Sequence, residues 1–423
     1  MVCIMAVVGI ICEYNPFHEG HKYHIQKAKE LTGADTVVAI MSGDFVQRGG
    51  PAVVDKYTRA RMALLEGADL VFELPVRYSI SSAEDFAYGG ILALESLSFV
   101  DAYCFGSECG DIQALERAGY FFAAEKDAFK KAGGDSCLNV YRDSLNCLLK
   151  EGHSYPEARE AAYREVMQRN GEDAQEGILS SPNNILGIEY IKAAAQLHSH
   201  MKPVTVLREG MGYNDSGEGD PRDSHAAHLF FSATAIRERM REGSFAYEGI
   251  PQAAGKVLSQ ADCYLEEEHF WTLCSYAVRN RWEGLGQIKD VSPELANRFR
   301  DSWYPAISMK DFAEKCKTKN VTMSRIRRCI FQVLLGVEKT GRHTGNLPYL
   351  RLLGMRRRAA GHLKRVSETV ILARLSRDME RLGKEELQML SEDIMASDVY
   401  RSVGMSVSGI WRPEEYKRRL ILI

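Results

Sequence analysis

The first part of the chain, up to about residue 110, alternates short apolar runs with longer segments of mixed polarity. The apolar runs have the length and β-branched content of buried strands, and they cover residues 5–12, 35–41, 70–74 and 102–105. Between them, apolar residues recur with helical spacing over residues 20–31, 56–66 and 83–97. Strands separated by helices of this length predict an α/β fold with a Rossmann-like, doubly wound parallel sheet. In such sheets ligands bind beyond the carboxyl ends of the strands.

The middle of the chain predicts a helical insertion into this sheet domain. Residues 111–175 are rich in Ala, Glu, Lys and Arg and have a helical pattern. Strand character returns at residues 203–207, and a polar, Gly-rich stretch over residues 209–225 is typical of a loop. We expect a mobile loop here, and closure over ATP is one hypothesis for it.

The C-terminal part has a different pattern. Beyond Pro251 the apolar spacing is helical nearly to the end, apart from a strand-like piece at residues 399–405. We therefore predict a ligand-binding α/β domain over residues 1–245, with the helical insertion inside it. A mainly α-helical C-terminal domain follows over residues 246–423.

Composition narrows the class of protein. The chain has 423 residues, of which 45% are hydrophobic and 26% charged, as in ordinary globular proteins. Its net charge of -3 argues against a wholly basic coat for nucleic acid but allows a local basic surface. The ten cysteines form no CxxC pair and show no zinc spacing, so we expect reduced thiols in the cytoplasm. We expect residues 5–12 to form a buried strand rather than a signal peptide, and no apolar run approaches the roughly 18 residues of a membrane span.

The clearest chemical signal is the segment EYNPFHEGH, which directly follows the first predicted strand. Within it, His18, Gly20 and His21 have a spacing suited to a phosphate site. Gly20 lets the backbone approach a phosphate because it has no Cβ, and the helix that follows offers free N–H groups. The two imidazoles would donate hydrogen bonds to the α and β phosphates and stabilise departing pyrophosphate. The alternative is a chance match in which both histidines only solvate a turn, and the position after a buried strand argues against it.

A second signal is the segment SATAIR, which begins at Ser232. It resembles the ISSTxIR signature that occurs late in the same nucleotidyltransferase superfamily. Ser232 is expected to cap a helix, and Arg237 with the first-turn N–H groups would hold the β and γ phosphates. Taken alone, the segment favours an ordinary Ser/Thr helix cap, and its occurrence together with the HxGH turn favours the phosphate role.

Longer segments resemble the bacterial tRNA(Met) cytidine acetate ligase family of the HxGH nucleotidyltransferase superfamily. They are EYNPFHEGHKYHI, IMSGDFVQRGGPAVVDKYTRARMALLEGADLVFELP, SSAEDFAYGG, FGSE and SPNNILGIEYIKA, and they cover most of the first 210 residues or so. The resemblance implies an ATP-dependent ligase that activates acetate as acetyl-adenylate and acetylates N4 of the wobble cytidine of elongator tRNA(Met). ATP, acetate and elongator tRNA(Met) are thus the implied substrates, and Mg²⁺ is expected with ATP because it neutralises the phosphates.

The resemblance also implies an ATP site. Family contacts come from the HxGH segment, from a Gly after the fourth strand, from the Asn of a Pro-Asn motif and from an Arg near a Gly-Tyr pair. We assign His18 and His21 as the catalytic residues. The predicted ATP-binding residues are Glu13, Tyr14, Asn15, Pro16, Phe17, Gly20, His24, Gly106, Asn183, Arg208, Ser232, Thr234 and Arg237.

Polar residues that follow the second predicted strand are candidates for the acetate pocket. They are Ser42, Asp44, Gln47 and Arg48. Arg48 would bind a carboxylate or a phosphate as a fork, and a solvated surface loop is the alternative. The chain departs from the family at Asp44 and Gly50, where the family has Asn and Glu, and at Asn214, where it has His.

Two basic tracts in the C-terminal half predict a surface for tRNA. Residues 315–328 and 351–365 each contain six basic residues and no acidic one, in what we take to be helical surroundings. The alternative is a solvated face that is balanced by acidic residues such as those at 266–268. The predicted tRNA-binding residues are Lys315, Lys317, Lys319, Arg325, Arg327, Arg328, Arg356, Arg357 and Arg358.

A second enzyme class shares this phosphate turn. Adenylyltransferases that make a nucleotide cofactor from a small phosphorylated acceptor are usually about one domain long. In such an enzyme the long basic C-terminal half has no use. A nucleotide-binding RNA module without catalysis is a third hypothesis, and it would require a damaged phosphate turn, whereas this turn is intact.

Overall fold

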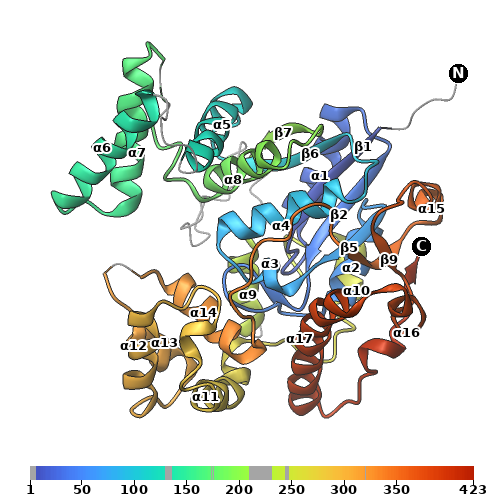
Figure 1. Ribbon diagram of the computed structural model, residues 1–423. Helices are drawn as coiled ribbons and strands as arrows, with labels where there is room; N and C mark the ends of the chain where they lie inside the picture. Colours follow the sequence, from blue (N-terminus) through green and yellow to red (C-terminus); the bar gives the residue numbers. More distant parts are fainter. Residues whose placement is uncertain are drawn as a thin grey trace, which may run out of the picture.

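A mixed, mostly parallel sheet forms the centre of the computed structural model (Figure 1). The structure describes residues 6–128, 136–172, 174, 176–208, 231–242, 247–319 and 321–423. In these residues the sheet has eight strands in the order β10-β8-β5-β2-β1-β6-β7, with β9 beside β8. The strands are β1 (Val7–Cys12), β2 (Thr36–Ser42), β5 (Leu70–Leu74), β6 (Ala102–Ser107), β7 (Lys202–Leu207), β8 (Tyr349–Met355), β9 (Val370–Leu372) and β10 (Ile421–Leu422). A separate hairpin pairs β3 (Phe45–Val46) with β4 (Gly50–Pro51). The predicted α/β fold with a parallel sheet is confirmed.

Helices cover the sheet and extend beyond it. Those up to residue 241 are α1 (Glu19–Thr32), α2 (Lys56–Leu65), α3 (Val76–Ser79), α4 (Ala83–Glu95), α5 (Ile112–Ala128), α6 (Ser136–Lys150), α7 (Tyr155–Arg169), α8 (Pro182–Gln196) and α9 (Ala233–Arg241). The later helices are α10 (Gln252–Leu258), α11 (Trp271–Asn280), α12 (Pro293–Trp303), α13 (Met309–Cys316), α14 (Met323–Leu335), α15 (Ala360–Leu363), α16 (Leu375–Asp378) and α17 (Lys384–Ser408). None of the helices in the described part of the chain is both long and apolar enough to cross a membrane.

Local capping chemistry sets several helix boundaries. His18, Asp55, Ser82 and Ser232 are the N-caps of α1, α2, α4 and α9, and each accepts a hydrogen bond from a backbone N–H in the first turn. At the other end of α1, Gly33 takes the left-handed conformation with φ of 67°. These residues explain why the helical patterns of the sequence predict the elements to within a few positions.

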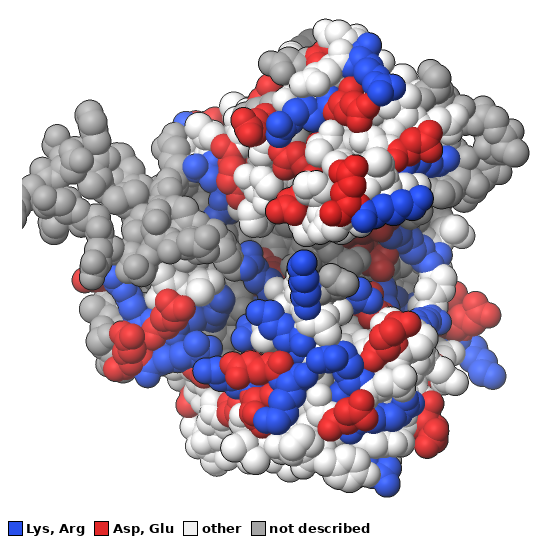
Figure 2. All heavy atoms as spheres, turned by 90° about the vertical axis from the view of Figure 1, so that its left-hand side faces the viewer, with Lys and Arg blue, Asp and Glu red and all other residues white. Residues whose placement is uncertain are grey.

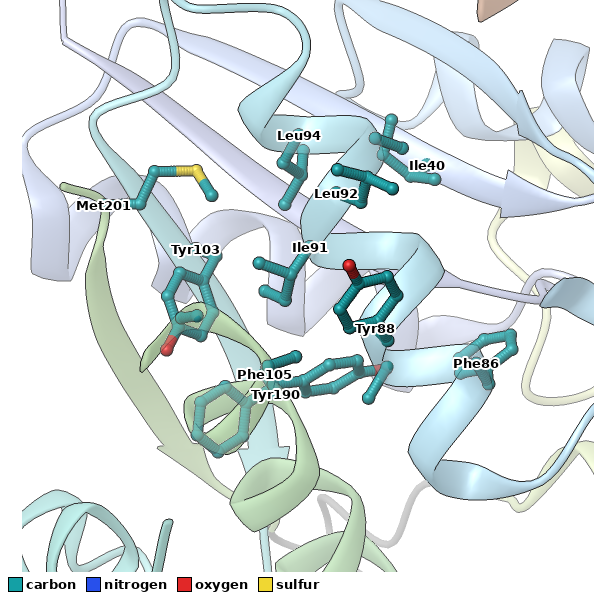
Figure 3. Packing of buried hydrophobic residues seen from close by; sticks show 14 of the residues in the cluster. Ile40, Phe86, Tyr88, Ile91, Leu92, Leu94, Tyr103, Phe105, Tyr190 and Met201 are labelled. Atoms are coloured by element: carbon teal, nitrogen blue, oxygen red, sulfur yellow. The ribbon is translucent and has the colours of Figure 1, made fainter. Parts of the chain in front are cut away.

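The two faces of the sheet enter two different hydrophobic cores. Along β2, Val38 and Ile40 face a core that α4 and α8 cover, whereas Val37, Ala39 and Met41 face a core that α1, α2 and α10 cover. This alternation follows from the two-residue period of a strand. Figure 3 shows the first core from close by, where side chains of α4 pack against aromatic rings from β6 and α8. Because both faces are buried, the strands have the continuous apolar runs from which they are predicted.

Two groups of helices project from the sheet on the left of Figure 1. We call α6 and α7 the insertion lobe, and α11 to α14 the helical lobe. The helical lobe has its own hydrophobic core, which also receives Phe45 from the β3–β4 hairpin and Tyr400 from α17. The hairpin is therefore packed between the sheet and the helical lobe.

The C-terminal half differs from the expectation in two places. The strand-like residues 399–405 lie inside helix α17, so that prediction is wrong: Tyr400 and Val403 are buried on one face of the helix, at helical spacing. The second basic tract begins in strand β8 rather than in a helix, and β8 pairs antiparallel with β5, which brings the C-terminal half back to the sheet. The predicted loop at 209–225, including Asn214, lies outside the described residues.

Candidate nucleotide-binding site

The HxGH turn joins the carboxyl end of β1 to α1, at the edge of the sheet where a ligand is expected. His18 Nδ1 accepts a hydrogen bond from the backbone N–H of Gly20 at 3.1 Å, and His21 Nδ1 accepts one from the backbone N–H of His18 at 3.2 Å. The two imidazole rings are stacked, with centroids 3.6 Å apart. Because each Nδ1 is an acceptor, each neutral ring carries its proton on Nε2, which is the atom left to donate to a ligand.

Burial keeps these imidazoles neutral. Desolvation lowers the pKa of His18 to about 3, and Arg208 and Arg237 contribute to the same shift. The pKa of His21 is also well below its usual value, mainly through desolvation. One turn along α1, desolvation lowers the pKa of His24 to about 4, and the buried His24 Nε2 has no hydrogen-bond partner in the described part of the chain. Neutral rings with available Nε2–H groups are suited to donate to phosphate oxygens.

The second predicted signal lies directly beside the first. Ser232 caps α9 and accepts a hydrogen bond from the Ala235 N–H at 3.1 Å. Arg237 donates from Nη1 to the carbonyl oxygen of Asn15 at 2.6 Å and from Nη2 to Thr234 Oγ1 at 3.1 Å. The two segments therefore form one site although Asn15 and Arg237 are 222 positions apart in the chain.

The carboxyl ends of β6 and β7 complete one side of this site. A Cβ at Gly106 would lie 3.1 Å from Cγ of Arg208, so Gly106 leaves room for that side chain. Arg208 Nη1 donates to Asn183 Oδ1 at 3.4 Å, and Asn183 Nδ2 donates to Glu108 Oε1 at 2.6 Å. The structure thus brings Gly106, Asn183 and Arg208 together, and Glu108, which we did not predict, orients the Asn183 amide.

Three arginines from different elements act on this site. Desolvation lowers the pKa of each of Arg48, Arg208 and Arg237. The Glu13 carboxylate raises the pKa of Arg48 and Arg237, whereas Arg208 lowers that of Arg48 and Arg48 lowers that of Arg237. The guanidinium groups are therefore close enough to repel one another. Like charges gathered at a partly buried site favour a polyanionic ligand such as a triphosphate.

The other polar side chains of the turn hold its backbone in place. Glu13 Oε1 accepts a hydrogen bond from the Gln47 N–H at 2.7 Å. Asn15 Oδ1 accepts one from the Val53 N–H at 2.8 Å. Both donors belong to the segment that contains the β3–β4 hairpin, so these two predicted ATP residues also connect the turn to that segment.

Buried aromatic side chains pack against the same turn. Tyr14 and Phe17 are buried, their ring centroids are 4.8 Å apart, and the Tyr14 ring is also 4.8 Å from the ring of His21. Pro16 lies between them after a cis peptide bond with Asn15. These three predicted residues shape the site, and the histidine Nε2 atoms remain for the ligand.

The four predicted acetate-pocket residues fall into two groups. Gln47 and Arg48 lie at the hairpin turn, where both interact with Glu13. Asp44 is buried and accepts a hydrogen bond from the Lys56 N–H at 2.8 Å, and desolvation raises its pKa to about 6. Ser42 is also buried, and its Oγ has no partner among the described residues. Of the four, Gln47 and Arg48 are thus the two whose hairpin turn lies next to the nucleotide turn.

Arg59 of α2 was not among the predicted site residues. Its buried guanidinium donates from Nη1 to the carbonyl oxygens of Glu13 at 2.7 Å and Ser42 at 3.0 Å, and from Nη2 to the carbonyl oxygen of Gly43. It therefore joins the carboxyl ends of β1 and β2. Its position in a helical pattern carries no signal for this role, because the three acceptors are backbone atoms of distant segments.

A buried ion cluster behind Asp44 was also missed. Lys56 Nζ lies 2.8 Å from carboxylate oxygens of both Glu73 and Glu415. Arg351 lies 3.1 Å from Glu415 and 3.8 Å from Glu73. All four side chains are nearly inaccessible to solvent. Lys56 also donates to Ser397 Oγ at 2.7 Å, so the cluster connects α2, β5 and β8 to the C-terminal segment.

The predicted tRNA-binding residues lie on two separate surfaces. Lys315 belongs to α13, the residues from Arg325 to Arg328 belong to α14, and Lys317 and Lys319 lie between these helices. The other three follow β8, where Arg356 donates to the carbonyl oxygen of Leu64 at 2.6 Å and Arg358 pairs with Asp69 at 2.7 Å, while Arg357 is exposed. In Figure 1, α14 and α15 lie on opposite sides of the sheet.

Comparisons with known proteins find similar chains at family level. A family model described as HIGH Nucleotidyl Transferase matches residues 5–409. The chain is similar to the tRNA(Met) cytidine acetate ligase of Caldicellulosiruptor saccharolyticus, with 40% identity over 86% of each chain. It is similar to that of Thermoanaerobacter pseudethanolicus, with 37% identity over 94% of this chain and 95% of the relative. Among solved structures it is similar to Thermotoga maritima TmcAL bound with alpha-thio ATP, with a TM-score of 0.83, 29% identity, and coverage of 99% of this chain and 100% of that chain.

Proposed function

This chain belongs to the tRNA(Met) cytidine acetate ligases of the HIGH nucleotidyl transferase family, and on this premise we propose that it uses ATP and acetate to acetylate N4 of the wobble cytidine of elongator tRNA(Met). In the first step an acetate oxygen attacks the α-phosphorus of ATP, the bond to pyrophosphate breaks, and acetyl-adenylate forms. In the second step the cytidine amine attacks the acetyl carbonyl carbon, AMP leaves, and the amine loses a proton.

The observation that carries this proposal is the stacked pair His18 and His21. Their Nδ1 atoms are held by backbone N–H groups, so their Nε2–H groups are preset as donors at the carboxyl edge of the sheet. Donors fixed before the reaction stabilise the charge that develops on the α-phosphate without reorganisation. Arg208 and Arg237 border the same turn and would hold the remaining phosphates.

Mg²⁺ would enter this site together with ATP. Among the described residues no group of three or more His, Cys, Asp or Glu side chains is placed to hold a metal ion. Phosphate oxygens and water are common ligands of Mg²⁺ at nucleotide sites, and they would supply most of its coordination here. We place the enzyme in the cytoplasm, where its tRNA substrate is found.

For the tRNA we propose the surface formed by α13, α14 and the residues between them. On the face shown in Figure 2, many Lys and Arg side chains lie on the lower part. In Figure 1 the insertion lobe lies above the helical lobe on the same side of the sheet. A basic surface beside the nucleotide site would hold the RNA backbone near the acetyl group.

The contacts of α14 support this choice over the second basic tract. Arg327 Nε lies 3.2 Å from Glu267, and Glu267 also raises the pKa of Arg237 in the nucleotide site. Arg356 and Arg358 are likewise paired within this chain, but on the far side of the sheet. We therefore assign the tract at 315–328, rather than the second tract, to the RNA surface.

The test is nucleoside mass analysis of elongator tRNA(Met) after incubation with the protein, ATP and acetate. We expect N4-acetylcytidine that depends on both small substrates, together with AMP and pyrophosphate. ATP cleavage without acetylated tRNA would reject the proposed acceptor and favour an adenylyltransferase acting on a small phosphorylated molecule. No ATP–pyrophosphate exchange with acetate would reject the activation step itself.

A further inference from the structure

The β3–β4 hairpin contacts the nucleotide turn on one side. Its Gln47 N–H donates to the carboxylate of Glu13 at 2.7 Å. Just after the hairpin, the Val53 N–H donates to Asn15 Oδ1 at 2.8 Å. Both acceptors belong to the segment that leads into the HxGH turn. A displacement of the hairpin would therefore displace side chains of the ATP site.

The same hairpin is anchored in the helical lobe on its other side. Phe45 is fully buried, with its ring centroid 5.7 Å from those of both Phe270 and Phe331. The carbonyl oxygen of Ala52 accepts a hydrogen bond from the Tyr400 hydroxyl at 2.8 Å. The hairpin therefore lies between the nucleotide turn and the core of the helical lobe. The core of the helical lobe thus fixes the position of a hairpin that also contacts the nucleotide turn.

The tip of the hairpin has no free space against α14. Gly49 takes a left-handed backbone with φ of 85°, and a Cβ there would lie 2.2 Å from the backbone nitrogen of Arg328 and 2.7 Å from the carbonyl carbon of Arg327. At the next position, a Cβ at Gly50 would lie 3.3 Å from the side chain of Glu267. Close-packed contacts of this kind transmit a shift rather than absorb it.

We propose that the β3–β4 hairpin is a positioning element that links nucleotide binding at the HxGH turn to RNA binding on α14. The inference rests on the proposed function, because it takes α14 as part of the RNA surface. RNA that contacts Lys317, Arg325 or Arg327 would set the position of α14, and the hairpin would carry that position to Glu13 and Asn15. Nucleotide that orders the turn would act on α14 in reverse, by the same factor, because coupling between two binding equilibria is reciprocal.

The first measurement requires no variant. The affinity of the full-length protein for elongator tRNA(Met) is measured with and without saturating α,β-methylene ATP, at one fixed salt concentration because RNA affinity depends steeply on salt. We expect the two dissociation constants to differ by about fivefold or more, which is the lower end of typical coupling between sites. Equal dissociation constants would overturn the inference.

Two glycine variants test whether the coupling runs through the hairpin or through direct contact between the two ligands. Gly49→Ala forces the hairpin tip away from α14, whereas Gly33→Ala has a similar left-handed φ of 67° and no atom within 4 Å of the new Cβ. Both variants bear the same kind of backbone strain. We expect the ratio of dissociation constants to fall towards one in Gly49→Ala and to stay at the wild-type value in Gly33→Ala.

The outcomes distinguish this inference from the proposed function. A wild-type ratio that survives in Gly49→Ala would overturn the hairpin route. If Gly49→Ala does not fold, Phe45→Leu serves as the second variant, because it loosens the aromatic anchor but keeps an apolar side chain; an unchanged ratio there would overturn the inference. Wild-type protein that forms N4-acetylcytidine but shows no linkage would leave the proposed function intact, whereas protein that binds no tRNA would overturn both.

Discussion

Two regions of this molecule keep charged side chains away from solvent, and the balance of charge differs between them. In the ion cluster behind Asp44, the cations Lys56 and Arg351 lie 2.8 to 3.8 Å from the carboxylates of Glu73 and Glu415. Each positive charge has its partner within the chain. Such a cluster joins distant segments of the fold and leaves nothing for a ligand to neutralise.

In the nucleotide site the cations also act on one another. Arg48, Arg208 and Arg237 are partly desolvated, and the pKa of Arg48 and that of Arg237 are lowered by a neighbouring arginine as well as by burial. The Glu13 carboxylate acts on two of them and is itself engaged by the Gln47 N–H. Arg208 and Arg237 donate to neutral amide, carbonyl and hydroxyl oxygens, whereas Lys56 and Arg351 lie against carboxylates. The difference teaches that the kind of acceptor, more than the number of cations, separates a site that receives an anion from one that holds the fold.

Loss of Lys56 should have the largest effect on stability. Lys56→Met leaves Glu73 and Glu415 buried without one of their two cations, and we expect unfolding to become easier by about 3–5 kcal/mol. Urea denaturation measures this change. Lys27→Met is the matched control, because its ion pair with Glu30 is exposed and such a pair contributes at most about 1 kcal/mol. Equal losses in the two variants would mean that the buried cluster does not stabilise the fold in this way.

Loss of His21 should have the largest effect on catalysis. His21→Ala removes one preset Nε2–H donor, and we expect acetate-dependent ATP–pyrophosphate exchange to fall by about 10²–10³-fold, as for loss of a donor to a developing anion. The affinity for tRNA should stay nearly unchanged. The exposed His200→Ala serves as the control for both assays. If the rate of ATP–pyrophosphate exchange is unaltered in His21→Ala, the assignment of this turn as the phosphate site is wrong.

The neutral state of His18 predicts a pH dependence of stability in the absence of nucleotide. The pKa of His18 is about 3 in the folded protein against 6.5 for an ordinary histidine. His18 therefore binds a proton near pH 6.5 in the unfolded chain but stays neutral in the folded protein. The free energy of unfolding consequently falls as the pH drops below 6.5. Between pH 7 and pH 5 this group alone removes about 2 kcal/mol. His18→Asn should lose less stability than wild type over that interval in urea titrations, and parallel losses would contradict a neutral, buried His18.

The smallest expected effect concerns the RNA surface. Lys317→Glu combined with Lys319→Glu reverses two exposed charges beside α14, and we expect weaker tRNA binding with unchanged acetyl-adenylate formation. The slope of log affinity against log salt should decrease by about one for each phosphate that the variant no longer neutralises. Arg357→Glu, exposed on the far side of the sheet, should weaken binding less. A larger loss of affinity in Arg357→Glu would move the RNA surface to the second basic tract.

The sequence could predict the elements whose cause is local. The strands β1, β2, β5 and β6 are continuous apolar runs, and the turn from His18 to His21 is defined by its own spacing and by its place after β1. Residues 399–405 show the limit of this approach. Their β-branched residues resemble a strand, yet they are part of α17, because the burial of Tyr400 and Val403 in the helical lobe core outweighs local propensity.

By itself, the sequence determined the first strands and helices, the phosphate turn and the presence of basic side chains, since each depends on residues that are neighbours in the chain. The tertiary structure alone decided which charges are paired: Lys56 of α2 meets Glu415 from the far end of the chain, and Arg351 returns to Glu73 only because β8 pairs with β5. It also decided that the first basic tract packs against the hairpin at Gly49, whereas Arg356 and Arg358 of the second bind Leu64 and Asp69. The physical reason is that periodicity and capping are local interactions, whereas the pairing of a buried charge depends on which distant segments the packed core brings within a few ångströms of it.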